Sequence, residues 1–292
     1  MVEKGKFEIF IFVTMTNILI AIKNLVENPV IDIKSYYQGR NRANSVGGAL
    51  ETYIKDIFAN TINSSEGESL TEYEKHFSYL GNQNNPPDLM IKNGDAIEVK
   101  KIQSPGSTLA LNSSFPKAKL YSDSPMITKS CRDCEDWKVK DIIYAVGYTS
   151  DDKINWLWLV YGDCYAADKS IYQRIKNKIT EGITEISDVE FTETKELGKV
   201  KKVDPLGITD LRIRGMWHIA NPNKVFQYIN DNEGAAFKLR VLMTRDKFNS
   251  FSKIDRENLE SLKQVKMKSV KIKNPNNTAK LLDSILIKYN IK

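Results

Sequence analysis

The amino-acid sequence predicts an α/β or α+β protein in which helices flank a central mixed β-sheet. Apolar residues recur at the helical period near the amino terminus, a hairpin signal and two apolar runs indicate strands in the middle, and helical spacing returns near the carboxyl terminus. In chain order the segments are residues 16–27 and 44–62 (helices), 88–102, 141–149 and 154–166 (strands), and 255–268 and 277–291 (helices). This order, without an internal repeat or an obvious linker, indicates one domain over residues 16–292.

The chain begins with an apolar stretch, residues 7–22, that we do not expect to cross a membrane. The stretch is too short for a span and is interrupted by polar residues. Its second half fits an amphipathic helix with Thr16 or Asn17 as the cap. We therefore interpret residues 1–15 as an amino-terminal extension outside the core domain; a strand there is the alternative.

The second helical segment, residues 44–62, has Asn44 or Ser45 as its cap and places Glu51 at the border of its apolar stripe. Two interpretations of Glu51 remain open: a solvated side chain, or an acid that leans into a cleft beside the hairpin. The loop before this helix mixes aromatic residues and amides with two arginines. Such a loop suits contacts to phosphate and equally suits an ordinary surface.

A short segment, "NPPDLMIKNGDAIEVKK", places two acids and a lysine close together. The Asn-Gly pair at residues 93–94 is a strong hairpin signal, so the strand that begins at Asp88 folds back on the strand "AIEVKKI". Because side chains alternate along a strand, Glu98 and Lys100 project from one face. Two carboxylates beside an ammonium suit a divalent cation such as Mg²⁺, which takes oxygen ligands and keeps several waters. The alternative is a surface hairpin with a solvated Glu–Lys pair.

The rest of the chain predicts a long loop, a basic helix and two further strands. Residues 103–130 have little periodicity and several prolines, which favours a functional loop, and the leucines within it argue against disorder. Residues 169–183 form a basic amphipathic helix, and residues 236–244 form a strand. Residues 210–226 begin as a strand that an Asn-Pro pair then breaks.

Composition and motifs exclude several classes of protein. The formal net charge of +6 over 292 residues is compatible with a polyanionic partner. Three cysteines argue against a disulfide scaffold and for a reducing cytoplasm. Cys131 and Cys134 form a C-x-x-C, but a structural zinc needs two more ligands, so we expect free thiols and no zinc. The chain lacks glycine-rich phosphate loops and the G-x-S-x-G motif, which disfavours nucleotide binding and esterase chemistry.

The Pro-Asp pair at residues 87–88, followed by Glu-Val-Lys at residues 98–100, resembles the PD-(D/E)XK nuclease signature. Four longer segments together resemble the NgoPII-type family of Type II restriction endonucleases over most of the chain. They are "GRNRANSVGGALETYIKDIFA" (39–59), "NPPDLMIKNGDAIEVKKIQSP" (85–105), "LALNSSFPKAKLYSDSPMI" (109–127) and "LRIRGMWHIANP" (211–222). The resemblance implies a restriction-endonuclease-like core with elaborations. It also implies a homodimer that cuts a short palindromic site in double-stranded DNA, GGCC in members of this type, with Mg²⁺.

By this resemblance, Asp88 and Glu98 are metal ligands and Lys100 is the catalytic lysine, while Glu51 lies on a helix that often supplies a further acid. Mn²⁺ is expected to support the reaction in place of Mg²⁺. The expected functional partner is a DNA methyltransferase, without a stable complex between the two proteins. Candidate DNA contacts come from three polar segments and are Arg40, Arg42, Asn112, Ser113, Lys117, Lys119, Arg212 and Arg214.

Two other functions remain as alternatives. One is another PD-(D/E)XK nuclease, acting in DNA repair or junction resolution. The other is a non-catalytic DNA-binding relative, against which the intact Asp–Glu–Lys set argues. Arg212 and Arg214 alternate on one predicted strand and are expected to reach a DNA groove, and pairing with surface acids is the alternative for them.

Overall fold

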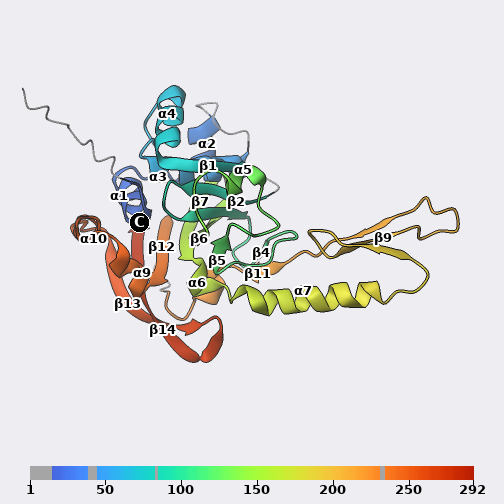
Figure 1. Cartoon of the computed structure of the whole chain (residues 1–292). Coiled ribbons are helices and arrows are strands. Elements are labelled where there is room, and N and C mark those ends of the chain that lie inside the picture. The colour runs from blue at the N-terminus through green and yellow to red at the C-terminus, as the bar shows by residue number, and fades with distance from the viewer. Residues whose placement is uncertain (1–14, 39–44, 83–84, 231–233) are drawn as a thin grey trace, which may run out of the picture.

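The centre of the protein is a mixed β-sheet in a computed structural model that describes residues 15–38, 45–82, 85–230 and 234–292 (Figure 1). Its strands are β1 (Phe77–Asn82), β2 (Asn85–Ile91), β3 (Ala96–Ile102), β5 (Lys119–Tyr121), β6 (Val139–Ser150), β7 (Lys153–Tyr161), β12 (Phe237–Thr244), β13 (Lys266–Asn274) and β14 (Asn277–Ile291). The order across the sheet is β1-β2-β3-β6-β7-β12-β14-β13, and β5 pairs with β6 off this path. The predicted fold class, a central mixed sheet flanked by helices, is confirmed.

The sheet is mixed because two of its strand pairs are parallel. β3 runs parallel to β6, and β7 runs parallel to β12, whereas the other neighbours are antiparallel. The two apolar runs predicted as strands are β6 and β7, which lie in the middle of the sheet. Strands buried on both faces are nearly continuous in apolar residues, which explains these runs. β7 ends at Tyr161, where the short helix α6 (Gly162–Tyr165) begins.

Helices cover one face of the sheet. They include α1 (Ile18–Glu27), α2 (Ile33–Gln38) and α3 (Val46–Ala59). Three further helices lie next to these: α4 (Glu66–His76), α9 (Arg245–Ser250) and α10 (Lys253–Glu260). α1 has Asn17 as its N-cap and α3 has Ser45, as predicted, and each side chain accepts hydrogen bonds from free N–H groups of the first turn. The apolar stripes of these helices share one buried cluster with Ile97 and Leu159 of the sheet.

Short elements cover the opposite face of the sheet. They are β4 (Thr108–Ala110), β11 (His218–Ala220), α5 (Lys129–Arg132), α6 and α8 (Pro222–Val225). β4 and β11 pair with each other in antiparallel register. Leu109, Leu111 and Leu120, from the segment predicted as a long loop, are buried in the cluster on this face. That segment is therefore packed against the sheet, as its leucines indicated.

The carboxyl-terminal segment corrects the sequence prediction. Residues 277–291, predicted as a helix, form the strand β14, and the helix predicted over 255–268 is limited to α10, after which β13 begins. Ile285 and Ile287 lie in the cluster under the helices, whereas Leu286 lies in the cluster on the other face. A strand buried on both faces has a continuous apolar run, and such a run also matches helical spacing. Periodicity alone therefore gave the wrong element.

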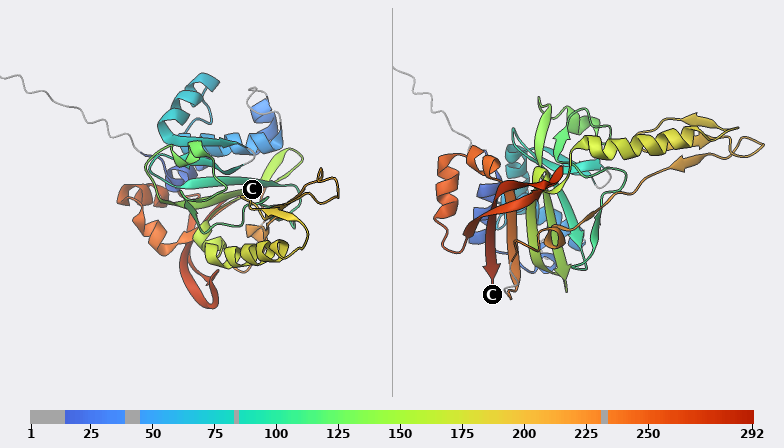
Figure 2. Two further views of the ribbon diagram at one scale, coloured as in Figure 1. Left: turned by 45° about the vertical axis from the view of Figure 1, so that its right-hand side comes forward. Right: turned by 90° about the horizontal axis from the view of Figure 1, so that it is seen from below.

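A long arm, residues 169–214, projects from the body (Figures 1 and 2). It consists of α7 (Lys169–Thr184) and a three-stranded sheet of β8 (Glu190–Thr192), β9 (Gly198–Lys201) and β10 (Leu211–Ile213). The basic helix predicted from the sequence is α7, and none of its 16 residues is buried. The segment 210–226, predicted to begin as a strand, contains two short strands, β10 and β11, of three residues each.

No helix in the described ranges is long and apolar enough to span a membrane. The predicted amino-terminal extension lies almost entirely outside the described residues.

Candidate active site

A cleft of about 460 Å³ lies beside β2 and β3, on the sheet face that the short elements cover. Seven of the residues predicted from the sequence line it: Asp88, Glu98, Lys100, Asn112, Ser113, Lys117 and Arg214. Ser114, Tyr144 and Glu196 also line the cleft, although no sequence pattern had singled them out. The cleft therefore brings together residues from three strands of the sheet (β2, β3 and β6), the 103–130 segment and the base of the arm.

The predicted hairpin brings Asp88 alongside the middle of β3. β2 and β3 pair in antiparallel register over two residue pairs, and Asn93 in the turn adopts the left-handed conformation with a φ of 53°. Beyond these pairs, Oδ2 of Asp88 accepts a 2.6 Å hydrogen bond from the backbone N–H of Val99. The Asp88 carboxylate is thus oriented by the strand that carries Glu98 and Lys100.

Glu98 and Lys100 project together from one face of β3, as alternation along the strand predicted. Nζ of Lys100 lies 2.5 Å from Oε1 of Glu98. Glu98 is 8% exposed, and its Oε2 is buried without a hydrogen-bond partner among the described residues. Since an unpaired buried carboxylate oxygen is costly, this atom marks a position for a cation or for a donor from a ligand.

Burial and charge set the protonation of the site. Burial, together with the negative charge of Glu98, raises the pKa of Asp88 from 3.8 to about 7. For Lys100, burial favours the neutral amine, but the carboxylates of Glu98 and Asp88 outweigh it and hold the lysine pKa above its usual value. A cation between the two acids would offset the cost of burying both negative charges.

Asp88 and Glu98 fit a hard divalent cation. Within the residues that the structure describes, no group of three or more His, Cys, Asp and Glu side chains is arranged to hold a metal ion. The protein therefore offers two carboxylates, and water would complete the coordination. Mg²⁺ is commonly bound in this way, through one or two carboxylates while it keeps several waters. The unpartnered Oε2 of Glu98 matches this donor set.

Glu51, the further acid implied by the family resemblance, lies on α3 near the site. Its Oε1 forms an ion pair of 2.7 Å with Nζ of Lys55, one turn later on the same helix. Its negative charge still contributes to raising the pKa of Asp88 and of Lys100. Glu51 is thus close enough to influence the site, and its role as a metal ligand stays a prediction.

Arg212 and Arg214 share one acidic partner at the base of the arm. Their Nε atoms lie 2.9 Å and 3.2 Å from Oε2 of Glu196, whose Oε1 accepts a 2.7 Å hydrogen bond from the Ser113 hydroxyl. Both arginine side chains remain more than half exposed, at 53% and 61%. The arginines therefore pair with an acid, one of the two alternatives for them, and still present their guanidinium groups to solvent beside the cleft. Base recognition by either one stays a prediction.

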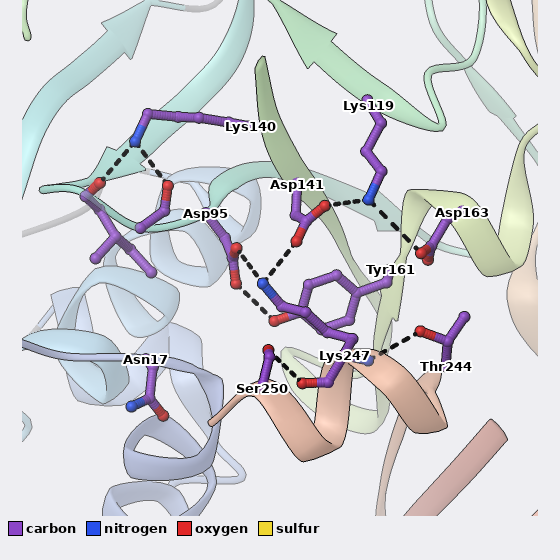
Figure 3. A network of polar contacts seen from close by, with 12 residues as sticks. Asn17, Asp95, Lys119, Lys140, Asp141, Tyr161, Asp163, Thr244, Lys247 and Ser250 are labelled. Carbon is purple, nitrogen blue, oxygen red and sulfur yellow. Dashed lines mark hydrogen bonds and ion pairs between the residues drawn. The ribbon is translucent and has the colours of Figure 1, made fainter. Parts of the chain in front are cut away.

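Lys117 and Lys119 lie in different surroundings although they are two residues apart. Lys117 is 9% exposed and its Nζ contacts the Ser114 hydroxyl in the cleft. Lys119 is paired with Asp141 and lies 3.7 Å from Asp163, within a network of charges at a different position (Figure 3). Lys119 is not among the residues that line the cleft.

The other candidate DNA contacts divide between the cleft and the part of the chain outside the described residues. Asn112 lies at the cleft, where its carbonyl accepts a 2.9 Å hydrogen bond from the Trp217 N–H. Arg40 and Arg42 fall within residues 39–44, outside the described ranges. No local signal in the sequence marks Ser114, Tyr144 or Glu196 as cleft residues, because a tyrosine in an apolar strand and a serine or glutamate in a loop are ordinary surface or core patterns.

The C-x-x-C segment is packed under the hairpin. Sγ of Cys131 lies 3.4 Å from Sδ of Met90, and Sγ of Cys134 donates to the Cys131 carbonyl at 3.1 Å. Burial raises the pKa of Cys131 to about 12, which keeps this thiol protonated and unreactive. The absence of a structural zinc stays a prediction.

Comparison with known proteins decides the family. The sequence model of the NgoPII restriction endonuclease family matches residues 16–274. The chain belongs to this family. The Type II restriction enzyme NgoPII of Neisseria gonorrhoeae is 50% identical over 277 residues, which cover 94% of this chain and 100% of that enzyme. No solved structure matches the chain.

Membership of the NgoPII family confirms the resemblance inferred from the four sequence segments. The protein is a Type II restriction endonuclease, a site-specific deoxyribonuclease, and enzymes of this class act on double-stranded DNA. The mixed sheet with its helices is consistent with a restriction-endonuclease-like core. The alternatives of a repair nuclease and of a non-catalytic relative are thereby displaced.

Proposed function

We propose that this restriction endonuclease hydrolyses phosphodiester bonds in a Mg²⁺-dependent reaction at the Asp88–Glu98–Lys100 site. The observation that carries the proposal is the convergence of these three side chains in one cleft, with a buried Glu98 oxygen that has no partner in the described chain. A buried and a partly buried carboxylate side by side are unfavourable without a cation, and the raised pKa of Asp88 expresses that cost.

In the proposed reaction, Asp88 and Glu98 hold the metal ion. Mg²⁺, when bound, lowers the pKa of a coordinated water and neutralises charge on the phosphate. Lys100, fixed by Oε1 of Glu98 at 2.5 Å, orients the attacking water toward the phosphorus. The N–H of Val99 holds the Asp88 carboxylate in position through its 2.6 Å hydrogen bond. The protein thus supplies orientation and a partly buried setting in which charges interact strongly.

For the substrate, we propose a short palindrome, GGCC, read by a homodimer in the cytoplasm. A palindrome has two-fold symmetry, and a C₂ dimer places one catalytic site at each strand. The eight candidate DNA contacts, four of which line the cleft, would supply phosphate binding and base recognition. A cognate DNA methyltransferase would protect the host without forming a stable complex. The 50% identity to NgoPII over the full length of that enzyme supports this proposal.

A digest of a plasmid of known sequence, followed by mapping of the fragment ends, tests the proposed substrate. All ends should fall at GGCC, and ends at any other sequence would reject this site. Asp88→Asn and Glu98→Gln test the catalytic centre, because they keep shape while removing charge. Both variants should lose cleavage and still bind a cognate duplex. Complete digestion by the Asp88→Asn protein at saturating Mg²⁺ would reject the metal site.

A further inference from the structure

The cleft contains a second lysine, Lys117, whose ammonium group is buried without an acidic partner in the part of the chain that the structure describes. Lys117 is 9% exposed. Among the described residues, the hydrogen-bond partners of its Nζ are the Ser114 hydroxyl and the Phe115 carbonyl, the latter at 3.5 Å. Neither partner carries a charge. A buried ammonium group normally requires a carboxylate or another anion, so this one is incompletely compensated in the free protein.

The fold holds the Lys117 backbone firmly beside Glu98. The Tyr144 hydroxyl accepts a 2.7 Å hydrogen bond from the Lys117 N–H and donates a 3.2 Å hydrogen bond to the Lys117 carbonyl. Tyr144 lies directly opposite Glu98 in the parallel register of β3 and β6. Gly162 packs against the Lys117 backbone so closely that a Cβ at this glycine would lie 2.4 Å from the Lys117 carbonyl oxygen. A position fixed on two sides by buried groups indicates that the location of this lysine matters.

The electrostatics of Lys117 agree with this geometry. Burial lowers its pKa to about 8, and Glu98 offsets the effect only in part, since Lys100 opposes it. Lys140, the other buried lysine among the described residues, pairs with Glu135, and the partly buried Lys247 pairs with Asp95 at 2.7 Å. Lys117 therefore differs from these lysines in having no acidic partner among the described residues. It also lies in the cleft where the phosphate is proposed to be cut.

We propose that Lys117 is a second catalytic lysine, whose ammonium group contacts a non-bridging oxygen of the scissile phosphate. This inference rests on the proposed function of the Asp88–Glu98–Lys100 site. During hydrolysis the water oxygen bonds to phosphorus, and the bond from phosphorus to the leaving oxygen breaks with its electron pair on that oxygen. The attacking water gives one proton to bulk solvent, and the leaving oxygen takes one proton from bulk solvent. Lys117 keeps its protons and stabilises the charge on the phosphoryl oxygens.

The test compares Lys117→Met with Lys140→Met. Both lysines are buried, at 9% and 7% exposure, and methionine preserves the apolar length of each, but only Lys140 has an acidic partner. Single-turnover cleavage of a short cognate duplex at saturating enzyme, the dissociation constant of that duplex in Ca²⁺, and the melting temperature are measured for each. Loss of a donor to transition-state charge costs about 10²–10³ in rate.

We expect Lys117→Met to lose that factor in rate at saturation without a lower melting temperature, and Lys117→Arg to recover part of the rate. Its affinity for the cognate duplex should fall much less than its rate. We expect Lys140→Met to cleave at the wild-type rate and to melt at a lower temperature, because a buried pair is broken.

Two results separate the failure of this inference from the failure of the proposed function. If Asp88→Asn is inactive while Lys117→Met cleaves at the wild-type rate at saturation, the metal site stands and Lys117 is not catalytic. The same conclusion follows if Lys117→Met loses affinity alone, or if it loses rate together with a lower melting temperature and Lys117→Arg recovers none of that rate. If Asp88→Asn still cleaves, the proposed function itself is wrong.

Discussion

Asp88→Asn should make the metal-free protein more stable at pH 8 while it removes cleavage. Burial and the Glu98 charge raise the pKa of Asp88 from 3.8 to about 7. The folded state therefore binds the Asp88 proton more tightly than the unfolded state does, and stability falls as the pH rises between these two values. Asparagine removes the buried charge and keeps an oxygen that can accept the hydrogen bond from Val99.

The structure bounds the size of this effect. A difference of about 3 in pKa corresponds to at most about 4 kcal/mol, at 1.36 kcal/mol per pKa unit. Glu98 and Lys100 readjust when the Asp88 charge is lost, so we expect a gain of about 1–3 kcal/mol at pH 8. A domain of this size gains roughly 2–4 °C in melting temperature per kcal/mol. The gain should shrink as the pH falls through 7 toward 4, because folded wild-type Asp88 then binds the proton that neutralises it.

Thermal unfolding followed by circular dichroism, in EDTA at pH 8, 6.5 and 5, measures the gain. Asp95→Asn is the matched control, because Asp95 is a buried acid with partners: Nζ of Lys247 at 2.7 Å and the Tyr161 hydroxyl at 2.6 Å (Figure 3). The same change there should lower stability, by up to about 3–5 kcal/mol for a broken buried pair. An Asp88→Asn protein that is no more stable than wild type at pH 8, or equally favoured at pH 5, would refute this reasoning.

Three further predictions concern the metal, DNA recognition and assembly. Mg²⁺ or Mn²⁺ should support cleavage, and Ca²⁺ should support binding without turnover because it activates water poorly; undiminished cutting in excess EDTA would contradict this. Arg214→Ala should weaken binding to a cognate duplex by about 1–3 kcal/mol more than binding to a scrambled one, and equal losses would indicate a phosphate contact. Sedimentation on DNA should give a dimer, and a monomer that cuts both strands in one encounter would contradict the proposed symmetry.

The hairpin that carries Glu98 and Lys100 could be predicted because each step rests on a local rule. An Asn-Gly turn reverses the chain, and alternation places Glu98 and Lys100 on one face. The helix caps Asn17 and Ser45 are local in the same sense. The helix predicted at residues 277–291 was wrong because residues 284–287 of β14 are buried on both faces, which erases the period that distinguishes strands from helices.

Contacts between distant segments could not be predicted from local rules. The Glu196 carboxylate meets Ser113, which is 83 residues away in the chain, and no pattern at either residue encodes that meeting. Lys117 and Lys119 share one stretch of sequence, yet one ammonium group is buried in the cleft and the other pairs with Asp141. Which of the two enters the cleft depends on how the 103–130 segment packs on the sheet.

The arm is expected to unfold locally while the rest of the protein stays folded. α7 buries none of its residues, and side chains such as Leu206 and Ile208 are 80% and 78% exposed. Regions with few buried apolar contacts open at a small fraction of the global unfolding free energy. Backbone amides of the arm should therefore exchange with solvent deuterium long before those of β6 and β7. A duplex or a second subunit that bound to the arm would slow that exchange. Part of its binding free energy would then stabilise the folded arm against local unfolding.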